Sequence, residues 1–252
     1  MSARLPAVVL AAPGPIRDGD VAAALELVGA APRVVTLAEL RDDPKLLGAA
    51  RLVVVAGGFT FADALGSGKL FALELAHILG EGVATLLAAG RPVLGICNGF
   101  QTLVRLGLLP GDDAPVVLAP NASGRFECRW VTLAPDPSSR CVWTRDLPEP
   151  ITCPVAHGEG RFEASPAVLD ALEAGGRVAL RYANADGAYP ANPNGSAQDI
   201  AGICDATGLV LGLMPHPENH VHDWQHPRWR RGDRRGNALA LFERGVRHAE
   251  LT

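Results

Sequence analysis

The chain has 252 residues, of which 48% are hydrophobic and 20% charged, and its formal net charge is -4. These values are ordinary for a globular protein and exclude a disordered or fibrous chain, and the mild acidity gives no general reason to expect binding to nucleic acid or membranes. A chain of this length buries roughly three quarters of its unfolded surface, enough for one core without disulfides. We therefore expect residues 1–252 to form a single domain.

Three features predict a cytoplasmic protein. The apolar run near the N-terminus is too short for a signal peptide, and no apolar stretch approaches the ~20 residues that a membrane helix needs. The five cysteines are an odd number without paired spacing, which favours reduced thiols over a disulfide framework.

The first hundred residues alternate apolar strands with helices. Strands are predicted at residues 7–12, 33–37, 52–56 and 92–96, and helices at 21–29, within 69–89 and directly after Cys97. Because these strands are apolar on both faces, they indicate a mostly parallel sheet covered on two sides. The predicted fold class is a three-layer α/β/α arrangement.

The second half has a different pattern, with short strands between turns rich in Pro, Gly and Asn. Strands are predicted at residues 126–133, 151–156, 177–182, 200–204 and 209–213, before a final helix at about 237–248. No internal repeat or linker separates the two halves. We expect the second half to extend the same sheet.

The stretch G-I-C-N-G, residues 95–99, lies between an apolar strand and an apolar helix. It fits the nucleophile elbow, G-x-nucleophile-x-G, in which Gly95 and Gly99 permit a close strand-to-helix turn. The helix that starts here places free N–H groups and a positive dipole near Cys97, and the amide of Asn98 can donate to an oxyanion. The alternative is that Cys97 is a small buried apolar residue. The other four cysteines, Cys128, Cys141, Cys153 and Cys204, are expected to be core or partly buried residues.

The segment M-P-H-P-E, residues 214–218, follows another predicted strand and offers a base and a carboxylate. Prolines favour an extended course, in which His216 and Glu218 point to the same side. A carboxylate in that position holds the imidazole in the tautomer that accepts a thiol proton. Taken alone, His216 is better explained by a structural role, and the strand end and the matching elbow make catalysis the favoured interpretation.

The stretch A-G-G-F, residues 56–59, directly follows the predicted strand at 52–56. Gly57 and Gly58 allow backbone amides to approach a ligand and to supply a second oxyanion donor beside Asn98. Without the other two motifs, a simple turn explains these glycines equally well.

Together these residues resemble the class I (triad) glutamine amidotransferases, which have a flavodoxin-like α/β fold. Within that class the chain is similar to the glutaminase subunits of phosphoribosylformylglycinamidine synthase, an enzyme of purine biosynthesis. The resemblance extends over most of residues 5–218. It rests on G-I-C-N-G-F-Q, A-G-G-F-T-F-A-D, N-A-S-G-R-F-E-C-R-W, A-H-G-E-G-R-F, N-P-N-G-S and L-G-L-M-P-H-P-E.

The resemblance implies a role for each matching residue. Cys97 is the expected nucleophile, His216 the general base and then acid, and Glu218 the group that orients it. Gly58 and Asn98 are the expected oxyanion amides. The residues expected to line the pocket for the amino-acid end of glutamine are Gly57, Gln101, His157, Gly158 and Glu159, with His157 alternatively a loop residue that contacts ligand through its backbone.

The resemblance also implies partners. No Walker-type phosphate loop occurs in the sequence, so ATP, Mg²⁺ and formylglycinamide ribonucleotide are expected on a synthetase subunit, with a small accessory subunit as a further partner. We expect no cofactor or metal ion on this chain. The alternatives are a glutaminase subunit of a different amidotransferase, a cysteine peptidase, or a non-catalytic partner-binding subunit.

Residues 219–236 form an unusual segment with five arginines, two tryptophans and three histidines. The histidine spacing matches no common zinc pattern. Arginine and tryptophan together are the composition of a single-stranded nucleic-acid platform, but the segment is brief and the chain is acidic. A solvated loop or a docking surface for the synthetase is the favoured interpretation.

Overall fold

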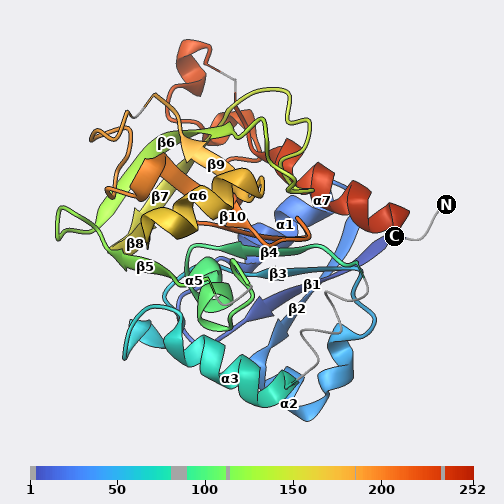
Figure 1. Ribbon diagram of the computed structural model, residues 1–252. Coiled ribbons are helices and arrows are strands. Elements are labelled where there is room, and N and C mark those ends of the chain that lie inside the picture. Colours follow the sequence, from blue (N-terminus) through green and yellow to red (C-terminus); the bar gives the residue numbers. More distant parts are fainter. Residues whose placement is uncertain (1–3, 81–89, 112–113, 185, 234–235) are drawn as a thin grey trace.

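A nine-stranded mixed sheet organises the protein, in the order β2–β1–β3–β4–β11–β10–β9–β6–β7 (Figure 1). The computed structural model describes residues 4–80, 90–111, 114–184, 186–233 and 236–252. One half of the sheet is parallel and the other antiparallel. The site is built on the parallel half.

The parallel half contains the five strands β1 (Leu5–Ala11), β2 (Ala30–Thr36), β3 (Leu52–Val55), β4 (Val93–Ile96) and β11 (Val210–Leu213). All five were predicted from the sequence to within a few residues. Their order, with β1 between β2 and β3, is that of a flavodoxin-like sheet. Because these strands are parallel, their carboxyl ends meet at one edge.

The antiparallel half contains β6 (Glu127–Pro135), β7 (Ile151–His157), β9 (Val178–Tyr182) and β10 (Ile200–Cys204). The expectation that the second half extends the same sheet is therefore confirmed. A separate antiparallel pair, β5 (Val116–Pro120) with β8 (Glu159–Ala164), was not predicted. Gly158 is the only residue between β7 and β8, so the motif A-H-G-E-G-R-F is a corner between two sheets.

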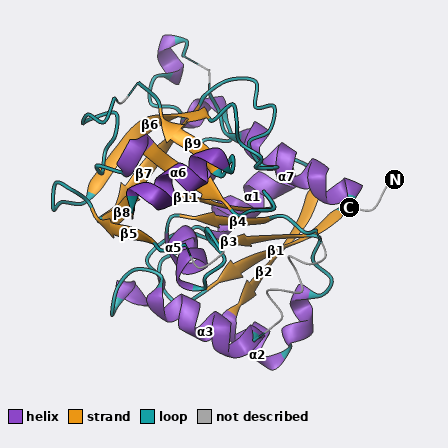
Figure 2. Ribbon diagram, in the orientation of Figure 1, coloured by secondary structure: helices purple, strands orange, loops and turns teal. Residues whose placement is uncertain are grey.

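Helices cover both faces of the parallel half (Figure 2). One face carries α1 (Asp18–Leu27) and α7 (Leu239–Leu251), and the other carries α2 (Leu37–Asp42), α3 (Lys69–Leu79) and α5 (Asn98–Arg105). Helix α6 (Pro166–Ala174) follows β8. The part of the predicted helical region at residues 81–89 lies outside the described residues. Short 3-10 turns occur at Pro44–Leu47, Pro217–Asn219, Asp223–Gln225 and Trp229–Arg231, and the turns at Thr60–Asp63 and Ala197–Asp199 contain left-handed residues.

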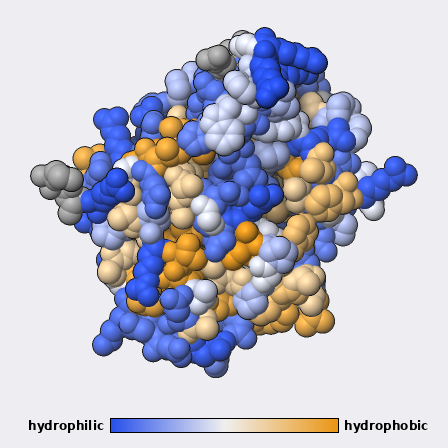
Figure 3. Space-filling model, turned by 180° about the vertical axis from the view of Figure 1, so that it is seen from behind, coloured by the Kyte–Doolittle hydropathy of each residue, from blue (hydrophilic) through white to orange (hydrophobic). Residues whose placement is uncertain are grey.

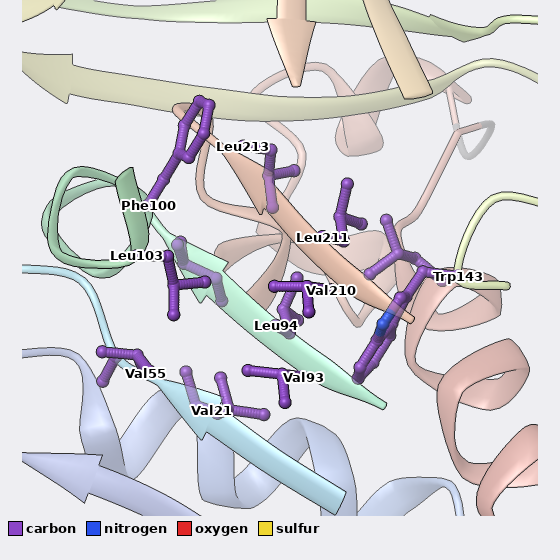
Figure 4. Close-up of a cluster of buried hydrophobic side chains, with 14 of the residues drawn as sticks. Val21, Val55, Val93, Leu94, Phe100, Leu103, Trp143, Val210, Leu211 and Leu213 are labelled. Carbon is purple, nitrogen blue, oxygen red and sulfur yellow. The ribbon is translucent and has the colours of Figure 1, made fainter. Parts of the chain in front are cut away.

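The core lies between the parallel strands and their helices. Every residue of β3, β4 and β11 is buried, and Figure 4 shows Phe100 and Leu103 of α5 beside the side chains of β4 and β11. Each large apolar side chain buried in this way contributes about 1.5–3 kcal/mol. The core thus fixes α5, and with it the elbow, against three neighbouring strand ends.

The surface seen from behind shows several apolar patches among hydrophilic residues (Figure 3). Among the described helices, none has the length and apolar character required to cross a membrane.

The approach of α5 to β3 is unusually close at Gly99. A Cβ built on Gly99 would lie 2.0 Å from the backbone oxygen of Val55, and one on Gly95 would lie 2.8 Å from the backbone oxygen of Gly99. No side chain fits between these backbone segments. The expected role of Gly95 and Gly99 in the strand-to-helix turn is therefore confirmed.

Gly99→Ala is expected to lower the free energy of unfolding by roughly 1–3 kcal/mol, because backbone must move to admit the methyl group. Gly19→Ala is the matched control, since a Cβ on Gly19 in α1 meets no heavy atom within 4 Å. It should leave stability unchanged or raise it by about 0.5–1 kcal/mol. Urea unfolding measures both, and equal effects of the two substitutions would contradict the close approach.

Candidate active site

Three loops meet at the carboxyl edge of β3, β4 and β11, which are neighbours in the sheet. The loop after β3 carries Gly57 and Gly58, the loop after β4 carries Cys97, and the loop after β11 carries His216 and Glu218. Motifs more than a hundred residues apart in the sequence are thereby brought to one place.

Cys97 lies at the sharp corner between β4 and α5. Its backbone has φ 50° and ψ -107°, an unfavourable conformation for a residue with a side chain, and the residue is 5% exposed. Helix α5 begins at the next residue, Asn98. Because the first N–H groups of a helix have no partner within it, the Asn98 amide is available for a ligand beside the sulfur.

His216 and Glu218 form a buried pair, with His216 Nδ1 2.7 Å from Glu218 Oε1. The predicted extended course of this segment is wrong. Pro217–Asn219 forms a 3-10 turn, and that turn, not strand alternation, brings the carboxylate back to the imidazole. The backbone amide of His216 also donates to the Pro154 carbonyl at 2.8 Å, which ties the backbone of His216 to β7.

The charges around His216 favour the protonated ring. Burial alone would lower its pKa, but the negative charge of Glu218 and that of an ionised Cys97, with hydrogen bonds to both side chains, raise the pKa well above its usual value. His216 therefore interacts with the thiol on one side and the carboxylate on the other. In this arrangement an imidazole can accept the proton of a thiol and later donate a proton.

Gly57 lies directly against both Cys97 and His216. A Cβ at Gly57 would be 3.0 Å from His216 Cε1 and 3.2 Å from Cys97 Cβ, so any side chain here would push the two apart. Gly58 forms an isolated antiparallel bridge with Ile16. The hydrogen bonds of that bridge run from Arg17 N to Gly57 O and from Phe59 N to Pro15 O, which leaves the Gly58 amide pointing away from Ile16.

The other predicted substrate-binding residues form a group beside the first turn of α5. Gln101 is 5% exposed, and its Nε2 donates to the Glu159 carbonyl at 2.9 Å. The Glu159 carboxylate accepts from the Ser67 amide at 3.4 Å, and the Gly158 carbonyl accepts from the Asn121 amide at 2.9 Å. These hydrogen bonds hold the corner between β7 and β8 against α5, the helix that begins after Cys97.

His157 is the last residue of β7 and not part of a loop, and its ring is buried. Its Nδ1 lies 3.0 Å from Asn121 Oδ1. Because Asn121 Nδ2 donates to two carbonyls, its oxygen must accept, so Nδ1 carries the proton of the neutral ring. Burial and the nearby charge of His216 lower the pKa of His157 to about 4, so this imidazole stays neutral.

A cavity of about 560 Å³ opens beside His216. Its rim includes Arg17 and Asp20, whose side chains pair at 3.1 Å, and Asn219, which donates to the same carboxylate at 3.3 Å. Cys128 also lines this cavity and is exposed. The expectation that Cys128 is fully or partly buried is therefore wrong, because β6 turns this side chain away from the core while Glu127 points inward.

Sequence reasoning missed a polar network around Asn98. Thr60 Oγ1 donates to Asn98 Oδ1 at 2.6 Å, and Asn98 Nδ2 donates to Asp63 Oδ1 at 2.8 Å. Burial and the charge of Glu159 raise the pKa of Asp63, although hydrogen bonds from Ser67 and Asn98 oppose this. The signal available in the sequence was the position of Thr60 and Asp63 just after the glycine pair.

The histidines of the C-terminal segment are used in packing. His220 and His226 lie edge-on to Trp130, with ring centroids 5.1 and 5.2 Å away, and His220 Nδ1 lies against the Thr152 carbonyl. Within the described ranges, no three or more His, Cys, Asp or Glu residues are grouped in a way that would hold a metal ion.

Residues 4–249 match the CobB/CobQ-like glutamine amidotransferase domain. The chain belongs to this glutamine amidotransferase family. Members with similar sequences include proteins named phosphoribosylformylglycinamidine synthase subunit PurQ. The one from Treponema denticola is 46% identical over 96% of this chain and 98% of its own length. The one from Dehalococcoides mccartyi is 40% identical over 96% of each.

Solved amidotransferase structures show the same fold. A chain in the structure of PurLQS from Thermotoga maritima matches with a TM-score of 0.74 at 30% identity, covering 99% of this chain and all of that one. A glutamine amidotransferase from the same organism, at 16% identity, has a TM-score of 0.58 and covers 98% of this chain and 99% of its own, which shows the shared fold alone.

Glu218→Gln is expected to lower the pKa of His216, because it removes the negative charge that favours the imidazolium while keeping the side-chain shape. The ring should then lose its proton at a lower pH. NMR titration of the His216 ring measures the shift. Glu250→Gln at the exposed C-terminal end of α7 is the control and should leave the titration unchanged, and an unchanged titration in Glu218→Gln would contradict the pairing.

Proposed function

We propose that this chain is the glutaminase subunit of a phosphoribosylformylglycinamidine synthase, with Cys97, His216 and Glu218 as its catalytic residues. The observation that carries the proposal is the buried His216–Glu218 pair, 2.7 Å apart, next to a cysteine in an elbow at the same sheet edge. Membership of the glutamine amidotransferase family supports the choice of glutamine as substrate.

The first half of the proposed reaction forms a thioester. The Cys97 thiolate attacks the side-chain amide carbon of glutamine, and the carbonyl oxygen becomes an oxyanion held by the amides of Asn98 and Gly58. The imidazolium of His216 gives its proton to the departing nitrogen, which leaves as ammonia. The γ-glutamyl group stays bound to sulfur.

The second half releases glutamate. His216, now neutral, accepts a proton from a water molecule that attacks the thioester carbon, and the same two amides stabilise the second oxyanion. The carbon–sulfur bond breaks and Cys97 leaves as a thiolate. Glu218 keeps the ring oriented throughout, because its carboxylate bonds to Nδ1 and leaves Nε2 for the chemistry.

We assign the amino-acid end of glutamine to the corner beside α5. Glu159 offers a carboxylate there, and Gln101, Gly158 and His157 fix the position of the corner through their hydrogen bonds. In the tautomer set by Asn121, His157 Nε2 is a neutral acceptor. Gly57 supplies the space in which sulfur and imidazole meet.

The ammonia is proposed to pass to a synthetase subunit that converts formylglycinamide ribonucleotide to formylglycinamidine ribonucleotide. The relatives named as synthase subunits and the PurLQS structure support this partner. ATP and Mg²⁺ are assigned to the synthetase, and a small accessory subunit is a further proposed member. The five free thiols suit a reducing, cytoplasmic location.

Cys97→Ser in the reconstituted complex is expected to lower glutamine-dependent synthesis by at least about 1000-fold, because a serine hydroxyl ionises far less readily than a thiol and is a weaker nucleophile. Synthesis supported by ammonium salts should be unchanged. Cys128→Ser is the matched control and should retain glutamine-dependent activity. Peptide cleavage without glutamine turnover would favour a cysteine peptidase, and equal activity of Cys97→Ser and wild type would favour a non-catalytic subunit.

A further inference from the structure

The two proposed oxyanion amides belong to separate loops, and a side-chain bridge connects those loops. Gly58 follows β3 and Asn98 begins α5. The carboxamide of Asn98 receives a hydrogen bond from Thr60 and gives one to Asp63, and both partners lie in the same loop as Gly58. Asn98, whose backbone amide is one of the two proposed oxyanion donors, therefore binds through its side chain to the loop that carries the other donor, Gly58.

The orientation of this bridge is determined by its chemistry. An ionised Asp63 carboxylate only accepts hydrogen bonds, so the NH₂ group of Asn98 must face it, and the Asn98 oxygen must face the Thr60 hydroxyl. Thr60 is 2% exposed and Asn98 is 1% exposed. Hydrogen bonds this deeply buried are costly to break, because water cannot replace the lost partner.

The loop after Gly58 has a strained backbone, and the bridge opposes relaxation of that strain. Phe61, Ala62 and Asp63 have φ values of 52°, 53° and 51°, so three successive residues with side chains adopt the left-handed conformation. L-amino acids rarely do so in series. Backbone bonds from Phe61 N to Pro13 O and from Ala62 N to Phe59 O hold the turn from one side, and Asn98 holds it from the other.

We propose that Thr60 and Asp63 are positioning residues that keep the Gly58 and Asn98 amides at a fixed separation, through the Asn98 side chain; this inference rests on the proposed function. Neither residue touches a reacting atom. Without the bridge, the strained turn relaxes and the Gly58 amide moves away from the position that the oxyanion occupies. The sulfur and imidazole keep their own supports, which are the elbow and the Glu218 carboxylate.

The test separates chemistry that needs an oxyanion from chemistry that does not. Alkylation of Cys97 by iodoacetamide is a direct displacement at carbon with no oxyanion, whereas acylation by p-nitrophenyl acetate and glutamine turnover both pass through a tetrahedral oxyanion. All three are measured on the full chain in complex with its synthetase, following the Cys97 peptide by mass spectrometry. The exposed Cys128 thiol provides an internal reference for reagent reactivity.

Thr60→Val is expected to lower kcat for glutamine about 10- to 100-fold with unchanged KM. Acylation of Cys97 by the ester should fall in parallel, and alkylation should match wild type. Thr60→Ser restores the hydroxyl and should recover most of the lost rate. If Thr60→Val does not fold, Asp63→Leu tests the same bridge from a less buried position. It should slow acylation of Cys97 and leave alkylation unchanged. Asp63→Asn, which keeps an acceptor for Asn98, is its control.

Three results would overturn the proposal: unchanged ester acylation in Thr60→Val, an equal loss of alkylation and acylation, or a Thr60→Ser variant as impaired as Thr60→Val. A wild-type complex that releases no ammonia from glutamine would refute the proposed function instead. The ratio of acylation to alkylation still decides the positioning role in that case, because neither reagent is glutamine.

Discussion

The close contact between the end of β3 and the first turn of α5 is the constraint on which the rest of the site depends. The backbone of Gly99 lies where no side chain fits beside the Val55 carbonyl, and Gly57 occupies the equivalent space beside Cys97 and His216. Because the helix starts this close to the sheet, Cys97 is forced into its unfavourable backbone conformation at the corner. The sulfur, the helix N-terminus and the loop after β3 are thereby crowded into one small volume.

Burial of the core is what maintains this crowding. Phe100 and Leu103 of α5 are buried and lie directly over Gly212 of β11 and Gly95 of β4 (Figure 4), and close-packed interiors resist small displacements. Strain at Cys97 and in the turn at residues 61–63 is then sustained by contacts elsewhere. A buried polar layer is built on this base, with His216 paired to Glu218 and Asn98 paired to Thr60 and Asp63.

The sequence predicted the parts of the site that depend on local rules. Gly95 and Gly99 around Cys97 imply a tight strand-to-helix corner, and strand ends in a parallel sheet must meet at one edge, so the convergence of the three loops followed from pattern alone. The pairing of His216 with Glu218 was predicted for an incorrect reason, since a 3-10 turn replaces the extended segment. Proline restricts its neighbours but does not choose between those two courses.

Features set by tertiary packing were not accessible from the pattern. The exposure of Cys128 depends on which face of β6 meets the core, and an alternation of mixed residues there leaves both choices open. The Asn121–His157 bond joins the residue that follows β5 to the last residue of β7, and the strand pair β5–β8 has no strong periodicity. The left-handed turn at residues 61–63 is contrary to local preference and is stable only because neighbouring loops hold it.

The central claim is that the sulfur of Cys97 carries the γ-glutamyl group, and the most direct measurement is to trap that intermediate. The complex is mixed with glutamine, quenched in acid on the millisecond timescale and digested for mass spectrometry. The account predicts an adduct of glutamine less ammonia on the Cys97 peptide, formed before free glutamate appears. Ammonia release with no adduct on that peptide, or with the adduct on Cys128, would contradict it.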